Sequence, residues 1–315
     1  MPKVLISTSS FAEYSSAPID MLLSAGMDVK INPYGRKLKE DEAIGLLKDI
    51  DYLIAGTEKL DRRVFENSKK LKVISRCGVG LDNIDLKAAE EFGIKIYNTP
   101  CGPTRSVAEF TLALILNILR KINNSDKDIR ENIWKKRMGS LLYKKIIGII
   151  GLGKIGKLLT DYLVPFNPEI IVNDIFPDMD YCLKKGISCV SIEELLSASD
   201  IVTLHISITG NTRPLIRERE LKMMKKNAVL INTSRGEAVD EESLYAAIKR
   251  GWISGSAIDV YQREPYCGRL TELDNVILTP HVASYTLEER VQMEIESAQN
   301  LLSAIDKIDS SHLGL

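Results

Sequence analysis

The sequence predicts an α/β fold built from two doubly wound parallel sheets. Short apolar runs alternate with longer amphipathic stretches along most of the chain, which is the rhythm of parallel strands joined by helices. A second series of this kind starts at a glycine-rich turn near the middle of the sequence. The 315 residues exceed one typical domain, and the 44% apolar and 27% charged shares are typical of folded globular proteins, so two domains are favoured over one.

Residues 1–100 carry the pattern of one small α/β unit. Its strands are expected at 4–7, 29–31, 52–55, 72–76 and 94–98, with helices at 17–25 and near 86–92. From 104 to 122 the pattern instead predicts one long helix, more apolar than a single surface-facing stripe requires and therefore buried on two sides. A polar stretch over 123–137 follows it.

A second α/β unit starts at the run KKIIGIIGLGKIG (144–156), where a buried strand ends on glycines and a helix begins. Six further strands are expected in series, at 170–174, 189–192, 201–206, 228–234, 255–260 and 275–280. Such a series predicts a doubly wound sheet. A last helical segment, 287–305, can return to the first unit, which would make that unit discontinuous in sequence.

Charge and cysteine usage argue against several classes of partner. Lys plus Arg (42) balance Asp plus Glu (43), so there is no strong field to attract nucleic acid or a membrane surface. The first residues do not resemble a secretory leader and no apolar run reaches membrane-spanning length, so the cytoplasm is expected. Five scattered cysteines suit reduced thiols, and with three histidines they show no metal-ligand spacing, so no metal is expected.

The glycine-rich run predicts a dinucleotide site. Gly151, Gly153 and Gly156 form a G-x-G-x-x-G pattern that makes a tight turn, lets a pyrophosphate approach, and permits close helix–strand packing. The next strand ends in Asp174, whose carboxylate can accept hydrogen bonds from ribose hydroxyls. No Arg or Lys stands in 175–177, which favours NAD over NADP. FAD can use the same glycine pattern, and a structural turn beside an incidental Asp is the alternative.

Three predicted strand ends carry side chains suited to reducing a 2-keto acid. Arg235 offers a planar fork for a carboxylate, His281 can give or take a proton near neutral pH, and Glu264 can orient the imidazole and favour its protonated form. Ligands collect at the carboxyl ends of parallel strands, so the three side chains can converge. Each also has an ordinary structural explanation: an arginine that closes a loop, a solvated glutamate, and a histidine that caps or packs.

Together these residues and their surrounding motifs resemble the D-2-hydroxyacid dehydrogenase family, and within it the short form of D-3-phosphoglycerate dehydrogenase. The motifs cover nearly the whole chain: RCGVGLDNID (76–85), NTP (98–100), RSVAEFTLAL (105–114), GLGKIG (151–156), VTLH (202–205), INTSRGEAVDE (231–241), SAIDVYQREP (256–265) and TPHVAS (279–284). The resemblance implies a Rossmann-type NAD-binding domain over 101–283. This domain would be inserted into a flavodoxin-like substrate domain formed by 1–100 and 284–315, with the active site in the cleft.

The resemblance also implies a role for individual residues. His281 is the acid/base, Glu264 orients it, and the substrate carboxylate meets Arg235 and the backbone amides of Val79 and Gly80. The implied cofactor contacts are Gly151, Gly153, Lys154, Ile155, Gly156, Asp174, His205, Thr233 and Asp259, the last near the nicotinamide carboxamide. A structural role for His205 is an equal alternative. The apolar helix that begins near residue 105 resembles the element with which family members dimerise, so a homodimer is expected.

The substrate depends on Arg76, which stands where phosphoglycerate dehydrogenases carry an arginine able to meet a phosphate. The leading hypothesis is therefore interconversion of 3-phosphoglycerate and 3-phosphohydroxypyruvate, a step of serine biosynthesis. Alternatively, Arg76 ends a strand and pairs with an acid. A second basic contact is in doubt, because Ala55 and Gly56 stand at its place with Lys59 nearby. Another D-2-hydroxy acid of the glyoxylate or hydroxypyruvate type, or a non-catalytic NAD-binding corepressor-like role, is the alternative.

Two departures from the family pattern concern loops and regulation. Ser207 stands where many members have proline after the VTLH motif, which leaves the cofactor loop open to change. The resemblance shows no long C-terminal extension, so the regulatory domain of longer phosphoglycerate dehydrogenases, and feedback by serine, are not expected.

Overall fold

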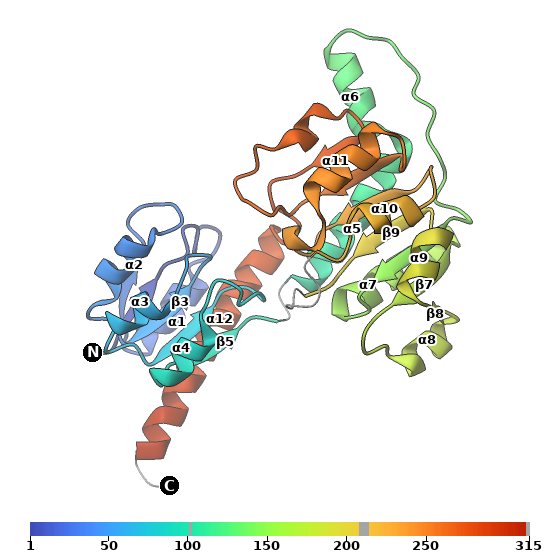
Figure 1. Cartoon of the computed structure of the whole chain (residues 1–315). Helices are drawn as coiled ribbons and strands as arrows, with labels where there is room; N and C mark the ends of the chain where they lie inside the picture. The colour runs from blue at the N-terminus through green and yellow to red at the C-terminus, as the bar shows by residue number, and fades with distance from the viewer. Residues whose placement is uncertain (101–102, 208–213, 313–315) are drawn as a thin grey trace. The chain divides into compact units, whose positions relative to one another are not determined.

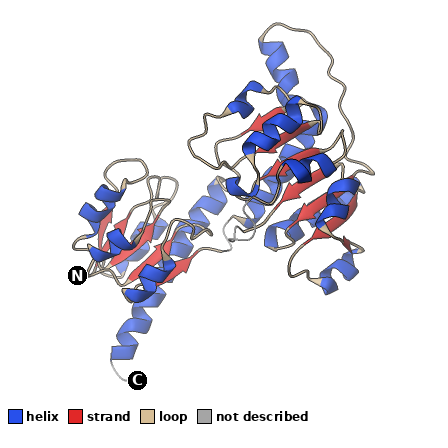
Figure 2. Ribbon diagram, viewed as in Figure 1, coloured by secondary structure: helices blue, strands red, loops and turns tan. Residues whose placement is uncertain are grey.

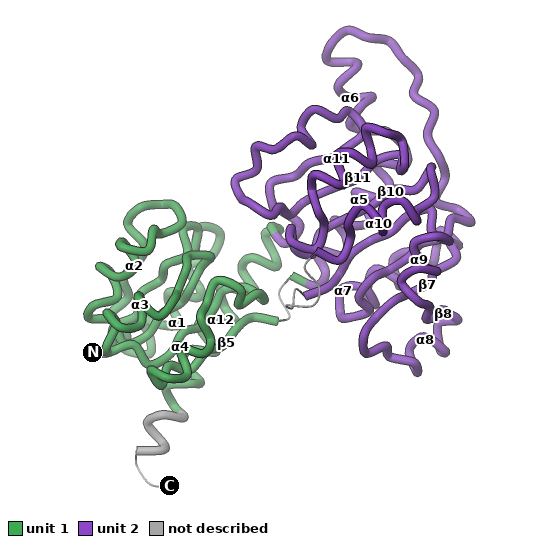
Figure 3. The backbone as a smooth tube through the Cα atoms, viewed as in Figure 1, with its two compact units in different colours: residues 1–103, 285–315 green, residues 104–284 purple. Residues whose placement is uncertain are grey.

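The computed structural model describes residues 1–100, 103–207 and 214–312, with side chains as far as residue 306. The chain divides into two compact units (Figure 3). Unit 1 consists of Met1–Pro103 and Tyr285–Leu315, and unit 2 consists of Thr104–Ser284. Each unit contains one parallel sheet flanked by helices, which confirms the predicted α/β class (Figure 2).

The sheet of unit 1 has five parallel strands in the order β2-β1-β3-β4-β5. These strands are β1 (Lys3–Ile6), β2 (Asp28–Ile31), β3 (Tyr52–Ala55), β4 (Val73–Arg76) and β5 (Lys95–Asn98). The order is that of flavodoxin-like sheets, in which the direction of winding reverses between β1 and β3.

Both faces of this sheet are covered, which explains why its strands are short continuous apolar runs. Alternate side chains point to opposite faces: Leu5 and Leu53 join one core, whereas Val4 and Ile54 join the other. The first core includes residues of α2 (Glu40–Leu47), α3 (Arg62–Glu66) and α4 (Leu86–Glu91), and the second includes residues of α1 (Ala17–Ser24) and α12 (Leu287–His312). The C-terminal helix therefore packs on the sheet formed by the N-terminal residues.

The sheet of unit 2 has seven parallel strands in the order β12-β11-β10-β9-β6-β7-β8. Figure 1 labels β7, β8 and β9 of this sheet. Counted from β6, this is the dinucleotide-binding order 3-2-1-4-5-6 with one further strand added, and the winding reverses between β6 and β9. The strands are β6 (Ile146–Ile150), β7 (Glu169–Asn173), β8 (Ser188–Cys189), β9 (Ile201–Leu204), β10 (Val229–Asn232), β11 (Gly255–Ile258) and β12 (Val276–Leu278).

Helices cover both faces of the second sheet as well. One core joins the sheet to α5 (Thr104–Arg120), α7 (Lys154–Leu163) and α8 (Met179–Lys185), and the other joins it to α9 (Ile192–Ala198), α10 (Glu218–Met223) and α11 (Glu241–Lys249). The remaining helix of the unit is α6 (Ile122–Arg130), and the short 3-10 turns are Val164–Phe166, Gly236–Ala238 and Arg269–Glu272. Among the described residues, no helix is long and apolar enough to cross a membrane.

Two predicted elements were wrong in extent. The long helix expected to reach residue 122 ends at Arg120, because Lys121 adopts the left-handed conformation with φ of 54°. The chain then continues as α6 through part of the stretch predicted to be only polar. The strand expected over 189–192 is limited to Ser188–Cys189, because the Ser191 hydroxyl accepts a hydrogen bond from the Glu194 amide and starts α9.

Candidate active site

The glycine-rich loop joins β6 to α7 at the point where the second sheet reverses its winding. Gly151 has φ of 96°, and a β-carbon there would collide with the His205 carbonyl oxygen. A β-carbon on Gly156 would collide with the carbonyl oxygen of Gly151. In the part of the chain that the structure describes, nothing lies within 4 Å of the β-carbon position of Gly153, and no side chain caps the N-terminus of α7. The loop is thus closely packed at Gly151 and Gly156, whereas its backbone at Gly153 is open. This geometry suits the binding of a pyrophosphate.

Asp174 lies directly after β7 and bonds to this loop. Its carboxylate accepts hydrogen bonds from the Leu152 amide at 2.6 Å and from the Phe176 amide at 2.8 Å. The side chain is partly exposed, and each carboxylate oxygen has a further lone pair for another donor. The predicted acidic residue therefore stands beside the glycine motif, as a ribose-binding acid requires.

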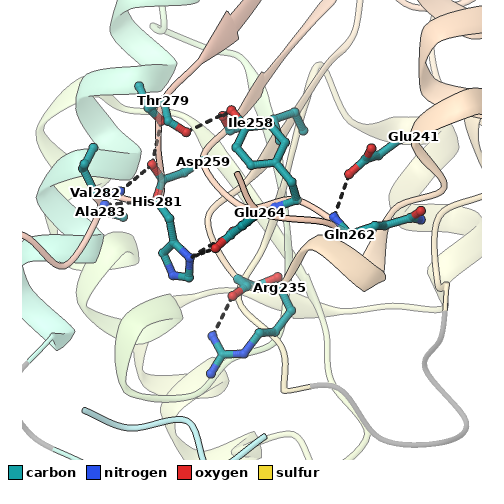
Figure 4. A network of polar contacts seen from close by, with 12 residues as sticks. Arg235, Glu241, Ile258, Asp259, Gln262, Glu264, Thr279, His281, Val282 and Ala283 are labelled. Atoms are coloured by element: carbon teal, nitrogen blue, oxygen red, sulfur yellow. Dashed lines mark hydrogen bonds and ion pairs between the residues drawn. The ribbon is translucent and has the colours of Figure 1, made fainter. Parts of the chain in front are cut away.

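His281 and Glu264 form an ion pair at the carboxyl ends of β12 and β11 (Figure 4). The Nδ1 atom lies 3.0 Å from both carboxylate oxygens of Glu264, so Nδ1 carries the shared proton. This hydrogen bond raises the pKa of His281 above its usual value, against the opposing effects of burial and of the positive charge of Arg235. The Nε2 atom bonds to no described residue, and half of the side chain is exposed. His281 thus has one ring nitrogen paired with a carboxylate that favours its protonated form and the other available for proton transfer.

The loop that carries His281 is anchored by a buried carboxylate. Asp259 is 0% exposed and accepts hydrogen bonds from the Thr279 hydroxyl at 2.6 Å and from the Val282 and Ala283 amides at 2.9 Å (Figure 4). Its own carbonyl accepts from the His281 amide. Between these hydrogen bonds, His281 adopts a left-handed backbone conformation, with φ of 55°. The motifs that contain Asp259 and Thr279 do not by themselves predict this anchor, because it joins residues of two different loops.

Arg235 follows β10 and extends toward the same region as the His281–Glu264 pair (Figure 4). One guanidinium nitrogen of Arg235 donates to the Ser234 carbonyl at 2.8 Å. The side-chain amide of Asn232 donates to the carbonyl of Arg235 at 2.9 Å. The side chain is partly exposed. The structure therefore brings together the three side chains for which the sequence predicted catalysis, on loops after three neighbouring strands.

Two further predicted cofactor contacts lie at strand ends but are engaged internally. The His205 Nε2 atom lies 3.0 Å from the Thr203 hydroxyl, while its Nδ1 atom has no partner among the described residues, and desolvation lowers the pKa of His205 to about 4. The buried Thr233 hydroxyl lies 3.0 Å from that of Thr111 on α5. A neutral His205 with an unsatisfied nitrogen suits a contact with a ligand, and Ser207 beyond it is exposed. The loop at 208–213, which Ser207 was expected to affect, lies outside the described residues.

The predicted carboxylate contacts of unit 1 lie in the loop after β4. The Asn98 side-chain amide donates to the Val79 carbonyl at 2.8 Å, and the Gly78 backbone amide donates to the Thr99 hydroxyl at 2.8 Å. The Val79 and Gly80 amides donate to none of the described residues. The loop is thus held firmly while two adjacent backbone donors are available, as recognition of an anion requires.

Arg76 at the end of β4 turns back over its own loop. Its guanidinium donates to the Cys77 carbonyl and lies over Gly78, where a β-carbon would collide with it. Lys59, the other nearby cation, pairs with Asp61 at 2.5 Å and with Glu40 at 3.6 Å. Both cations considered for a substrate phosphate are therefore already engaged with partners of the chain itself.

A Rossmann-type unit with a glycine-rich turn, an acid bonded to that turn and a histidine hydrogen-bonded to a glutamate is typical of nucleotide-dependent dehydrogenases. Residues 112–283 match the family "D-isomer specific 2-hydroxyacid dehydrogenase, NAD binding domain". The chain belongs to this family of NAD-dependent oxidoreductases, which confirms the predicted family, enzymatic class and cofactor. Among the described residues, no three His, Cys, Asp or Glu side chains are grouped so that they could hold a metal ion.

Individual relatives point to more than one substrate. A glyoxylate reductase of Korarchaeum cryptofilum is 38% identical over 266 residues, which cover 82% of this chain and 80% of the relative. A D-3-phosphoglycerate dehydrogenase of Synechocystis is 36% identical over 306 residues, 96% of this chain but 54% of the relative. The structure of an Aquifex aeolicus D-lactate dehydrogenase complexed with NAD and lactic acid is similar with a TM-score of 0.85, at 28% identity, and covers 98% of this chain and 96% of that one.

The Glu264–His281 hydrogen bond gives a direct prediction. Replacing Glu264 with Gln removes the charge that raises the pKa of His281, so we expect the imidazole to titrate at lower pH than in the wild type. The measurement is an NMR titration of the imidazole protons, which is tractable because the chain has three histidines. Glu169→Gln, an exposed position at the start of β7, is the control and should leave the titration in place. An unchanged titration in Glu264→Gln would mean that the pair does not control the protonation of His281.

Proposed function

We propose that the protein transfers a hydride between NAD and the α-carbon of a small, unphosphorylated 2-keto or D-2-hydroxy acid, with His281 as acid/base. The observation that carries this proposal is the His281–Glu264 ion pair with its available Nε2 atom, beside the guanidinium of Arg235. The NAD-binding fit of the Gly151–Gly156 loop and Asp174 supports it.

In the direction of reduction, each residue has one task. Arg235, together with the Val79 and Gly80 amides, binds the substrate carboxylate by charge-assisted hydrogen bonds. Protonated His281 donates its Nε2 proton to the keto oxygen as the α-carbon is reduced, and Glu264 holds the ring and stabilises its charge before transfer. Bound NADH supplies the hydride. In the direction of oxidation, neutral His281 accepts the hydroxyl proton through the same nitrogen.

Our preference for an unphosphorylated substrate rests on the two cations of unit 1 that could bind a phosphate. Arg76 bonds to a backbone carbonyl, and Lys59 is paired with two carboxylates. Recruiting either cation to a phosphate would require breaking these contacts. The similarity to glyoxylate reductases agrees with this preference. A 3-phosphoglycerate dehydrogenase of serine biosynthesis is the second candidate, favoured by Arg76 itself and by the relative of that name.

The reaction is tested by an NADH-absorbance assay with glyoxylate, hydroxypyruvate and phosphohydroxypyruvate. We expect His281→Ala to lower kcat by about 10²–10⁴-fold, the range typical of a general acid, while NADH affinity stays nearly unchanged. Asp174→Ala should do the reverse and weaken NADH binding, because it removes the acid beside the glycine loop. Loss of NADH binding in His281→Ala would contradict these roles, and NADH binding without turnover of any acid would favour a non-catalytic binding protein.

Arg76 separates the two substrate candidates. Because its guanidinium is engaged with the Cys77 carbonyl, we expect Arg76→Ala to change KM for glyoxylate and phosphohydroxypyruvate by similar factors. Steady-state kinetics with both acids make the comparison. A rise of tenfold or more in KM confined to the phosphorylated acid, as loss of a charged hydrogen bond would cause, would favour the phosphoglycerate dehydrogenase instead.

We also propose a homodimer that uses α5, α6 and the segment after them. One face of α5 is buried, whereas several of its other apolar side chains are only partly buried. The following segment exposes several large apolar side chains, among them Trp134 (87%), Met138 (86%) and Leu141 (67%). Exposed apolar surface of this kind marks an interface in soluble proteins.

A cytoplasmic location also stays a proposal, supported by the four described cysteines, all of which are free.

The dimer proposal predicts that Trp134→Ser combined with Met138→Ser weakens self-association, because it removes apolar area that a partner would cover. Sedimentation velocity should show a shift from dimer to monomer. Leu183→Ser, equally exposed at 84% on α8 of the same unit, is the matched control and should leave the dimer intact. A monomeric wild type, or a dimer that survives the double substitution, would reject this interface.

A further inference from the structure

The loop that carries Glu264 lies against the turn that carries Arg235, and both belong to unit 2. A β-carbon on Gly236, the residue after Arg235, would collide with the carbonyl group of Tyr261 and with the amide nitrogen that follows it. The backbones of the two loops are therefore in contact, and this contact requires a glycine at position 236. The placement of Glu264 relative to Arg235 then depends on what holds these two loops together.

Gln262 joins the two loops through its backbone and its side chain. Its backbone amide donates to Glu241 Oε1 at 2.7 Å (Figure 4). Its side-chain amide donates to the Val239 carbonyl at 2.9 Å. Val239 ends the 3-10 turn Gly236–Ala238, and Glu241 is the first residue of α11. One residue of the Glu264 loop thus binds two points of the segment that follows Arg235.

The segment that contains Glu241 is itself fixed to the body of unit 2. The Asp240 backbone amide donates to the Ile216 carbonyl at 2.9 Å. The Asp240 side chain accepts a hydrogen bond from the Ser243 amide at 2.7 Å and caps the N-terminus of α11. Leu244 on this helix is 0% exposed and belongs to the core of the unit. Glu241 therefore provides a rigid support for the loop that it binds.

Tyr261 supports the same loop from the side of β12. Its hydroxyl donates to the Thr279 carbonyl at 2.9 Å, and its ring is 8% exposed and stacks on Tyr266 with the centroids 4.3 Å apart. Its backbone amide donates to Glu264 Oε1 at 3.2 Å. Because the side chain of Glu264 is itself 41% exposed, its position depends on these contacts of the neighbouring residues. Residues 261 and 262 thus hold the loop from two directions.

Glu241 differs in its contacts from an ordinary acid at the start of a helix. Such an acid is stabilised by the helix dipole and the first amides of its own helix. The Glu241 carboxylate instead accepts from an amide 21 residues further along the chain. Burial, with the charges of Asp240 and Glu242, raises the pKa of Glu241, whereas the hydrogen bond from the Gln262 amide lowers it. The bond to Gln262 therefore offsets part of the cost of placing the acid there.

We propose that Glu241 and Gln262 are positioning residues, which hold Glu264 against the imidazole of His281 and fix it relative to Arg235. This inference rests on the proposed function, because it gives the link a purpose in proton transfer. A small displacement of a group that orients an acid/base lowers the rate strongly. A displaced Glu264 would also bond to His281 less well and raise its pKa less.

The test is Glu241→Ala, which removes the acceptor of the Gln262 amide. We expect kcat for the reduction of glyoxylate to fall about tenfold while NADH affinity stays unchanged, because Glu264 is held less firmly. His281 should titrate at lower pH than in the wild type when its imidazole protons are followed by NMR. Since reduction needs the protonated imidazole, kcat should also decline at lower pH than in the wild type.

Two further variants separate the hydrogen bond from the charge. Glu241→Gln keeps an oxygen for the Gln262 amide but has no charge, so it should restore most of the activity and the titration that Glu241→Ala loses. Gln262→Ala keeps the backbone amide and loses only the bond to Val239, so we expect kcat to fall about twofold to threefold. Equal losses in Glu241→Ala and Glu241→Gln would mean that Glu241 acts through its charge, which would overturn the proposal.

Glu242→Ala is the matched control, because Glu242 is the next residue of α11, is exposed and pairs with Arg269 at 3.1 Å. It should change neither kcat nor the titration of His281. If Glu241→Ala does not fold, Gln262→Ala decides the question with the same measurements. An unchanged pH profile and an unchanged titration, even with a lower Tm, would show a merely structural role and overturn the proposal.

The proposed function fails in a different way. A wild type that reduces no 2-keto acid would overturn that function, whereas the NMR titration of His281 needs no turnover. A titration shifted to lower pH in Glu241→Ala would then still support the role of Glu241 in holding Glu264 on His281, and an unshifted one would reject it.

Discussion

The candidate active site depends on the buried carboxylate of Asp259. This side chain has no contact with solvent, so water does not compete for its three hydrogen bonds. These hydrogen bonds join the loop after β12 to the end of β11. The loop then holds His281 in a left-handed conformation that a free chain rarely adopts. The predicted contact of Asp259 with the nicotinamide carboxamide stays a prediction, but its role in holding the loop is evident from its hydrogen bonds.

Parallel winding explains why the chemical groups of each unit are gathered at one edge of a sheet. In unit 2, loops after four strands of one sheet provide the glycine turn, Arg235, Glu264 and His281. In unit 1, loops after β3 and β4 provide Lys59 and the Val79–Gly80 amides. Since the strands are hydrogen-bonded to their neighbours in the sheet, these loops start from fixed positions. The sheets therefore supply rigidity, and the loops supply chemistry.

The residues proposed for the reaction and those considered for substrate recognition lie mostly in different units of the chain. The family match and the His281–Glu264 pair concern unit 2 and define the chemistry. The two cations considered for a substrate phosphate, Arg76 and Lys59, lie in unit 1, and both are engaged with partners of the chain itself. Relatives with different substrates can therefore share the same overall fold and still differ at these few loop positions.

The sequence by itself determined the fold class, the strand series, the glycine turn with Asp174, and the chemical types at positions 235, 264 and 281. These features are local patterns or short motifs, and such patterns report secondary structure and turn chemistry directly. It did not determine the break at Lys121, the short β8, the engaged state of Arg76, the bond between Gln262 and Glu241 or the burial of Asp259. Those depend on contacts between residues distant in sequence, such as Gln262 with Glu241 and Asp259 with Ala283. Only tertiary structure decides which polar groups are desolvated and which donors reach them.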